Sequence, residues 1–305
     1  MLYEWFIQPV LEFSFLRRAV VGTFVLSLGA APVGVFLILR RLALAGEAMS
    51  HAAVPGIAIA YLLAGLSVLS LTIGGLITGL AVALLSGLIA RSTVQHEDAS
   101  LAAIYLIALA SGIFILSLYG SHIDLSGFLF GSVLGLDDDT LILIGISTST
   151  TLVALAFILR GLVMECVDPQ FFRSVGGSGA RVHFVFTVLV VLNLVAGFKA
   201  LGTLMSVGLI ILPAASARYW GRTITGTLVW ATAIAVVSSY AGLLISLHAS
   251  TPSGPSIILF AGAVFIFSLL FGRFGVVTRL LARTEPVAAP GTANRRAFMA
   301  PEVEP

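Results

Sequence analysis

Long apolar runs separated by short polar breaks follow one another along the 305-residue chain, from about residue 19 to residue 277. Each run has roughly 17–25 mostly apolar residues, the length of an α-helix that crosses the hydrocarbon core of a bilayer. The pattern predicts an all-α polytopic membrane protein with about nine transmembrane helices, eight being the alternative. The expected spans are 19–39, 47–66, 70–90, 101–119, 140–159, 182–198, 200–217, 224–247 and 256–277.

The composition agrees with this pattern, because only 10% of the residues are charged and the mean hydropathy is +1.10. A soluble globular domain carries about 25% charged residues, so that class is excluded. Charged residues such as Glu4 and Arg17 precede the first run, which is unlike a cleavable signal peptide. We expect one transmembrane domain over residues 1–283 and a polar, proline-containing tail over 284–305 that is disordered.

The positions of Arg and Lys predict the orientation, because short cytoplasmic loops collect these residues. With nine spans and the N-terminus outside, only three of the 16 Lys and Arg residues fall on the outer side, namely Arg17, Arg18 and Lys199. An even number of spans would move one terminus and make this division less uneven. We therefore expect an outer N-terminus and a cytoplasmic C-terminal tail.

Two connections differ from ordinary loops. Residues 160–182 form the longest inner connection, with a helix start at Asp168-Pro169 and a stop at Gly176-Gly177. Residues 126–136 on the outer side are too apolar for a loop and too short for a span, so we expect a re-entrant segment or half-helix shielded by protein. The acidic run Asp137–Asp139 after it could attract cations or cap the next helix.

A carboxylate and an imidazole stand four residues apart in GEAMSHAAVPG, residues 46–56, so Glu47 and His51 would lie on one face of a helix. Both side chains ligate divalent transition metals, and Glu with His suits zinc, manganese or iron. The alternative is structural, with Glu47 solvated at the inner membrane boundary and His51 bonded to a neighbouring helix. Ionisable residues in a span cost roughly 2.5–3.5 kcal/mol on insertion scales, which favours a metal pathway.

Other polar residues are weaker candidates for a metal path. Glu97 and Asp98 stand at an inner helix end, where a solvated cap is the alternative role. His122 and Asp124 belong to the acidic outer side. Asn193 and His248 are expected to be structural.

Several enzyme classes are excluded. The GGSG sequence at residues 176–179 resembles the nucleophile setting of rhomboid proteases, but it falls in an inner loop. His183 is too close to it in sequence to be presented from another helix. The chain contains neither HExxH for a zinc protease nor GxxxxGK[ST] for nucleotide phosphates. We therefore expect no ATPase in this chain and no enzymatic activity.

Four stretches lie in order between about residues 37 and 218: LRRLALAGEAMSHAAVPGIAIAYLLAG, LFGSVLGL, DPQFFRSVG and ALGTLMSVGLIILPAASAR. Together they resemble the permeases of the ABC-3 family, whose corresponding segments read GDALSHAALPG after an Arg-rich turn, YLFGSIL, D-x-x-F-A-x-x-x-G and G-x-L-L-x-x-A-L-L-I-x-P-A-A-T-A-R. The resemblance implies the membrane subunit of a zinc, manganese or iron ABC importer. It also implies a type II importer fold in the bacterial inner membrane.

The resemblance implies roles for individual residues. Glu47 and His51 would be pathway ligands for transported zinc or manganese, with no permanently bound cofactor. The segment at about 164–180 would be the coupling helix that sits in a groove of a separate ATPase subunit. The helix containing Pro213 would be a packing and gating helix of the permease. A second partner would be an extracytoplasmic metal-binding protein, and no nucleic acid is implied. The implied coupling residues are Asp168, Gln170, Phe171, Arg173 and Gly176.

One ligand pair per chain would give a Glu2His2 site if a two-fold homodimer brought both copies to its axis, close to the four ligands that zinc prefers. Glu47 stands where the family usually has Asp. The glutamate side chain is longer, which affects the metal that the site would prefer. Two other functions stay open here. One is a permease for metal chelates such as siderophores or cobalamin, with a wide pore without ligands. The other is a secondary metal transporter driven by an ion gradient.

Overall fold

The computed structural model of the chain describes residues 8–65, 67–94, 97–119 and 133–278, and all regular structure within these ranges is helical. Nine segments among the described residues are long and apolar enough to cross a membrane, which confirms the predicted all-α class and number of spans. The elements are α2 (Gln8–Glu12), α3 (Ser14–Leu39), α4 (Ala43–Ala52), α5 (Val54–Ala64), α6 (Val68–Ser92), α7 (Glu97–Tyr119), the 3-10 turn η1 (Val133–Gly135), α9 (Asp138–Val167), α10 (Pro169–Ser174), α11 (Gly179–Ala217), α12 (Ile224–Ala249) and α13 (Ser253–Phe271).

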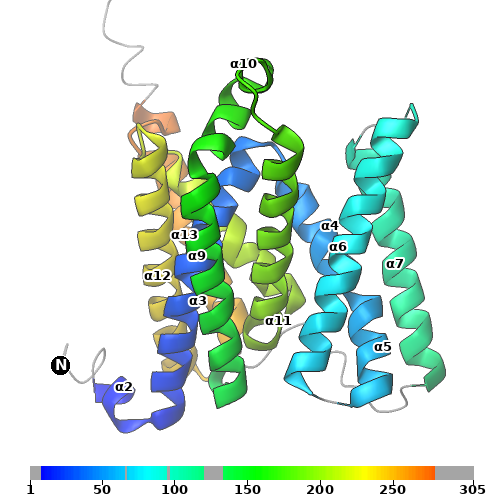
Figure 1. The fold of residues 1–305 in the computed structure, drawn as a ribbon. Helices are drawn as coiled ribbons and strands as arrows, with labels where there is room; N and C mark the ends of the chain where they lie inside the picture. The colour runs from blue at the N-terminus through cyan, green and yellow to red at the C-terminus, as the bar shows by residue number, and fades with distance from the viewer. Residues whose placement is uncertain (1–7, 66, 95–96, 120–132, 279–305) are drawn as a thin grey trace, which may run out of the picture.

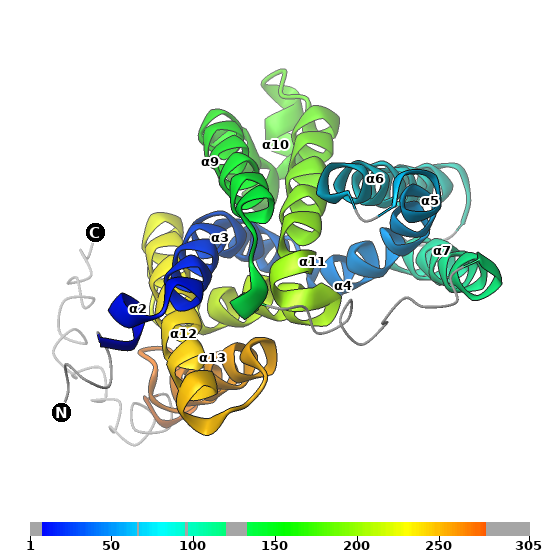
Figure 2. The same cartoon turned by 90° about the horizontal axis from the view of Figure 1, so that it is seen from below.

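The helices pack in two groups that meet at α4 and α11 (Figures 1 and 2). In the first group α3, α9, α12 and α13 pack around α11, and in the second α5, α6 and α7 pack on one another. α4 lies between the groups, in contact with α11 on one side and with α6 and α7 on the other. The short helix α10 projects at one end of the bundle, next to the ends of α9 and α11 (Figure 1). In this arrangement the two predicted functional segments, α4 and α10, both contact α11.

The close contact between α3 and α11 depends on Gly34. A Cβ atom added to this glycine would lie 1.9 Å from the carbonyl oxygen of Ile210, which belongs to the backbone of α11. Small residues let transmembrane helices approach closely, and here the approach leaves no room for a methyl group. Val33 and Phe36, on either side of Gly34, are fully buried in the same core.

We expect Gly34→Ala to destabilise the protein by about 1–3 kcal/mol, the usual cost of overpacking, because the backbone of α11 has to move. Gly262→Ala in α13 is the matched control, since a Cβ atom there has nothing within 4 Å. Alanine also favours a helix over glycine by roughly 0.5–1 kcal/mol, so this control should hold or gain stability. Thermal unfolding in detergent measures both variants, and equal melting temperatures would contradict the packing argument.

α9 corrects a predicted boundary. It continues to Val167, well past the expected end of the fifth span at residue 159. The apolar run stops at Arg160, but the following residues GLVMECV still favour a helix, and the chain leaves it only at Asp168-Pro169, since proline disfavours the helical conformation in the residue before it. At the other end, Asp137 accepts a hydrogen bond from the backbone N–H of Thr140 at 3.1 Å. The capping interpretation of this acidic residue is confirmed.

α11 contains two predicted spans without a loop between them. Gly202 has φ 80° and ψ 167°, a backbone conformation that favours glycine, and the helix bends there. Ala200, Leu201 and Thr203 around the bend are completely buried. Most of the expected re-entrant segment 126–136 lies outside the described residues, and its described end contains η1.

Candidate metal pathway and coupling surface

The helix that carries Glu47 and His51 is α4, which begins directly after a tight corner. Arg41 in that corner has φ 61°, and the N–H of Leu42 donates a hydrogen bond to the carbonyl of Leu37 at 2.8 Å. The small and unbranched residues of ALAGEAMSHA then favour a helix. α4 ends before Ala53, and Pro55 lies in the first turn of α5, where a missing N–H is tolerated. The predicted span therefore divides into two helices behind the ligand pair.

Three residues form the stripe of α4 that the rest of the chain leaves most open. Leu44, Glu47 and His51 follow the spacing i, i+3 and i+7, so they share one helix face. Leu44 is 81% exposed, Glu47 is exposed and His51 is half-buried. The remaining residues of the same turns are buried, namely Ala45, Gly46, Ala48, Met49 and Ser50. The two candidate ligands therefore lie on the outer face of the protomer instead of in its core.

The opposite face of α4 is fixed to its neighbours. The hydroxyl of Ser50 donates a hydrogen bond to the carbonyl oxygen of Thr203 at 3.1 Å, directly after the bend of α11. On the side of α7, the ring of Tyr105 stacks beside that of His51, with ring centroids 6.4 Å apart and an interplanar angle of 26°. These contacts from α7 and α11 set the rotation of α4, and with it the direction in which Glu47 faces.

Of the four weaker candidates, two belong to another helix and two fall outside the described residues. Glu97 and Asp98 lie in the first turn of α7, and His122 and Asp124 fall outside the described residues. Across the described ranges, no group of three or more His, Cys, Asp or Glu residues could hold a metal ion. Among the described residues, Glu47 and His51 are therefore a pair on α4.

Asn193 and His248 agree with the structural roles expected of them. The amide nitrogen of Asn193 donates hydrogen bonds to the hydroxyl of Thr151 at 2.7 Å and to the carbonyl of Leu189 at 2.8 Å. Nδ1 of His248 lies 2.8 Å from the carbonyl oxygen of Leu244, one turn earlier in α12. The bond from Asn193 to Thr151 joins α11 to α9, and the contact of His248 lies within α12.

The start and stop signals predicted at Asp168-Pro169 and Gly176-Gly177 are confirmed by α10. The carboxylate of Asp168 accepts hydrogen bonds from the backbone N–H groups of Gln170 at 3.0 Å and Phe171 at 2.9 Å. Asp168 is therefore the N-cap of the helix. After its last residue, Gly176 turns the chain with φ 82°.

The two adjacent phenylalanines of α10 have different surroundings. Phe172 is buried, and its ring lies against Gly161 of α9 and Gly177 beyond the helix. Phe171 is 54% exposed, and Val175 is exposed beside it. Phe172 anchors α10 to the bundle, and Phe171 is available to a partner.

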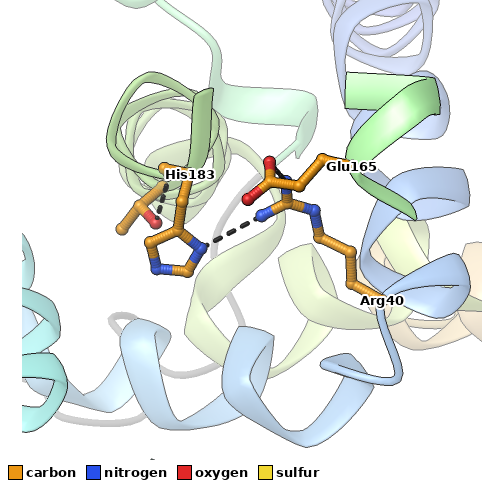
Figure 3. Close-up of polar contacts among 4 residues, drawn as sticks. Arg40, Glu165 and His183 are labelled. Carbon is orange, nitrogen blue, oxygen red and sulfur yellow. Dashed lines mark hydrogen bonds and ion pairs between the residues drawn. The ribbon is translucent and has the colours of Figure 1, made fainter. Parts of the chain in front are cut away.

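A polar cluster that the sequence patterns did not predict lies near α10: Arg40 with Glu165 and His183 (Figure 3). Arg40 forms an ion pair with Glu165, and its Nη1 atom lies 3.0 Å from Nδ1 of His183. A guanidinium group can only donate, so Nδ1 of His183 accepts and the ring carries its proton on Nε2. The guanidinium carbon also lies 5.1 Å from the ring centroid of Phe186, within cation–π range. The available sequence signal was one acidic residue, Glu165, in an otherwise apolar segment.

The comparisons with known proteins agree with one another over most of the chain. A profile of the ABC 3 transport family matches residues 12–272. The manganese transport system membrane protein MntC of Halalkalibacterium halodurans is 31% identical over 278 residues, which is 90% of this chain and 94% of that protein. The high-affinity zinc uptake system membrane protein ZnuB of Haemophilus influenzae is 30% identical over 258 residues, 84% of this chain and 97% of that protein. Among solved structures, PsaBC from Streptococcus pneumoniae in complex with Fab contains a chain with a TM-score of 0.82 at 27% identity, covering 92% of this chain and all of that one.

Proposed function

This chain belongs to the ABC 3 transport family, and from that membership we propose that it is the permease subunit of an ATP-binding-cassette importer for divalent transition metal ions. Manganese and zinc are the leading cargoes, because the relatives described above carry these two metals in their names, and iron is the third. The permease provides the path through the membrane. ATP hydrolysis belongs to a separate ATPase subunit.

The observation that carries this proposal is the open stripe of α4. A charged side chain that faces hydrocarbon costs roughly 2.5–3.5 kcal/mol on insertion scales, so an exposed Glu47 within a span needs water or a second protomer beside it. With a rise of 1.5 Å per residue, His51 lies roughly 6 Å farther along the helix axis. Two ligand positions in succession bind an ion strongly enough to admit it and weakly enough to release it.

A second copy of the chain is the proposed neighbour of this stripe. Two ligands do not satisfy a divalent transition metal, whereas a two-fold axis beside α4 would gather two Glu47 and two His51 side chains. The stripe is suited to such an axis, because Leu44 next to the ligands is 81% exposed and would be covered by the partner. The homodimer thus completes the site and separates it from lipid.

α10 is the proposed docking element for the ATPase. Its candidate contact residues are Asp168, Gln170, Phe171, Arg173 and Gly176, of which Phe171 is the exposed apolar anchor. The end of the bundle with α10 also carries the Arg40-Arg41 corner, so we assign it to the cytoplasm, with the N-terminus outside and the C-terminus inside. An extracytoplasmic binding protein would deliver the ion at the other end of the bundle.

Uptake measurements test the proposed function. We expect a bacterial strain without its own manganese and zinc importers to accumulate one of these radioactive ions when it produces this chain with its ATPase and binding protein. Omission of the ATPase should abolish the uptake, because the sequence of the permease contains no GxxxxGK[ST] motif for nucleotide phosphates. Uptake by the permease alone would establish a secondary transporter instead, and uptake of an iron chelate without uptake of free ions would establish the chelate class.

A further inference from the structure

The Arg40 cluster connects three places in the chain that are far apart in sequence. Arg40 lies at the end of α3, Glu165 lies near the end of α9, and His183 lies in the first turns of α11. Glu165 precedes α10 by four residues, and His183 follows its last residue by nine. One guanidinium group therefore contacts both elements that flank α10.

The ion pair at the centre of the cluster is largely shielded from water. The side chains of Arg40 and Glu165 are only 9% and 18% exposed. Loss of one partner from a buried ion pair leaves an uncompensated charge, which is far more harmful than neutral replacement of both. The planar fork of arginine serves Glu165, His183 and the ring of Phe186 at once, and a lysine ammonium cannot do this.

Arg40 is also rigidly connected to the ligand helix. Only Arg41 and Leu42 separate it from the first residue of α4, and Glu47 follows seven residues after Arg40. The backbone between them is fixed, because Arg40 donates its N–H to the carbonyl of Phe36 at 3.0 Å and Leu42 donates to that of Leu37 at 2.8 Å. Arg41 holds φ 61°, a conformation in which residues other than glycine are uncommon. A displacement of Arg40 therefore moves the start of α4.

We propose that Arg40 is a positioning residue that transmits movement of α10 to α4 through Glu165 and His183, so that ATPase action changes the placement of Glu47 and His51. This inference rests on the proposed function and adds to it the route between the ATPase and the metal ligands. The route starts where α10 joins α9 and α11, passes through the guanidinium group and enters α4 at the fixed corner. Arg40 itself does not contact the ion.

The test separates coupling from folding with a neutral double replacement. Arg40→Gln combined with Glu165→Gln removes both charges together, so no charge is left buried without a partner. We expect the complex of this variant with its ATPase to assemble and to hydrolyse ATP within about twofold of the wild-type rate. The amount of metal taken up per ATP hydrolysed should fall at least about fivefold, the lower end of the usual range of coupling between sites. The measurement uses reconstituted vesicles in which uptake of radioactive manganese or zinc and phosphate release are followed together.

Two further variants make the result specific. Arg160→Gln in α9 is the matched control, because Arg160 is an exposed arginine in the same helix as Glu165. It should keep the wild-type ratio of uptake to hydrolysis. Arg40→Lys retains the charge but not the fork, and we expect an intermediate ratio.

The outcomes distinguish this inference from the proposed function. Wild-type uptake with equal ratios in the double variant and in Arg160→Gln would overturn the inference and leave the proposed function standing. A wild-type complex that hydrolyses ATP but takes up no manganese, zinc or iron would overturn the proposed function, and the inference with it. A double variant that loses ATP hydrolysis and metal uptake in proportion would show a structural role for the cluster, which also contradicts coupling.

Discussion

Glu47→Gln and His51→Ala should each lower metal uptake at limiting metal at least about tenfold, while ATP hydrolysis by the assembled transporter continues. Each change removes one ligand position per protomer from the open stripe of α4, and in the proposed dimer each removes two of four. A divalent ion then meets a dry barrier with too few ligands to replace its water, and a tenfold loss corresponds to only about 1.4 kcal/mol. Neither side chain is needed to form α4, whose buried face consists of other residues.

Leu44→Ala is the matched control for these two variants. Leu44 lies on the same stripe and is 81% exposed, but it offers no ligand atom. Its uptake should fall clearly less than that of either ligand variant, because truncation of Leu44 removes apolar area from the proposed dimer contact but no ligand. Glu47→Asp should retain uptake and shift the preference between manganese and zinc, because it shortens the ligand arm. Uptake by His51→Ala equal to that of Leu44→Ala would show that the pair is a structural contact.

Phe171→Asp should abolish stable association with the ATPase subunit. Phe171 is the exposed apolar residue of α10, and large aromatic residues at the centre of an interface commonly contribute 2 kcal/mol or more, roughly a thirtyfold change in affinity. A carboxylate at the same position also places an unpaired charge in the contact. The fold should be retained, because the neighbouring Phe172 keeps α10 anchored against Gly161. Co-purification of the two subunits and their binding isotherm measure the effect.

Val94→Asp controls for the general effect of a new acidic residue on the surface of the protein. Val94 is 98% exposed in the connection between α6 and α7, away from α10. We expect this variant to bind the ATPase normally. If Phe171→Asp retained the wild-type affinity, α10 would not be the docking element.

The spans were predictable because apolar length is a local property of the sequence. The same holds for α10, whose beginning depends on Asp168 and Pro169 and whose end depends on Gly176. The end of α9 was predicted too early, since the apolar run stops at Arg160 while the backbone continues as a helix to Val167. Hydropathy predicts where the membrane-spanning part of a helix ends, but it does not predict where the helix itself ends.

For the candidate site too, some features follow from nearby residues in the sequence and others depend on contacts between distant residues. The shared face of Glu47 and His51 follows from their spacing, and α4 confirms it as a helix. This face of α4 is exposed because α7 and α11 cover the opposite face. The spacing of residues alone cannot predict which face is covered. The ion pair of Arg40 and Glu165 joins residues 125 positions apart, so no window along the chain contains both. Such contacts are visible only after the helices have packed.

The bend of α11 also bears on how the protein enters the membrane during synthesis. The two spans Gly179–Phe198 and Ala200–Ala217 meet without a polar loop, and most of each is buried by other parts of the chain. The insertion machinery therefore finds no hydrophilic loop between the two spans. If synthesis stopped after the first span, only half of this helical pair would be in the membrane. The two halves should enter the bilayer together, as a single unit. Their final tilt then depends on the earlier helix α3 and also on α12 and α13, which are synthesised later and pack against them.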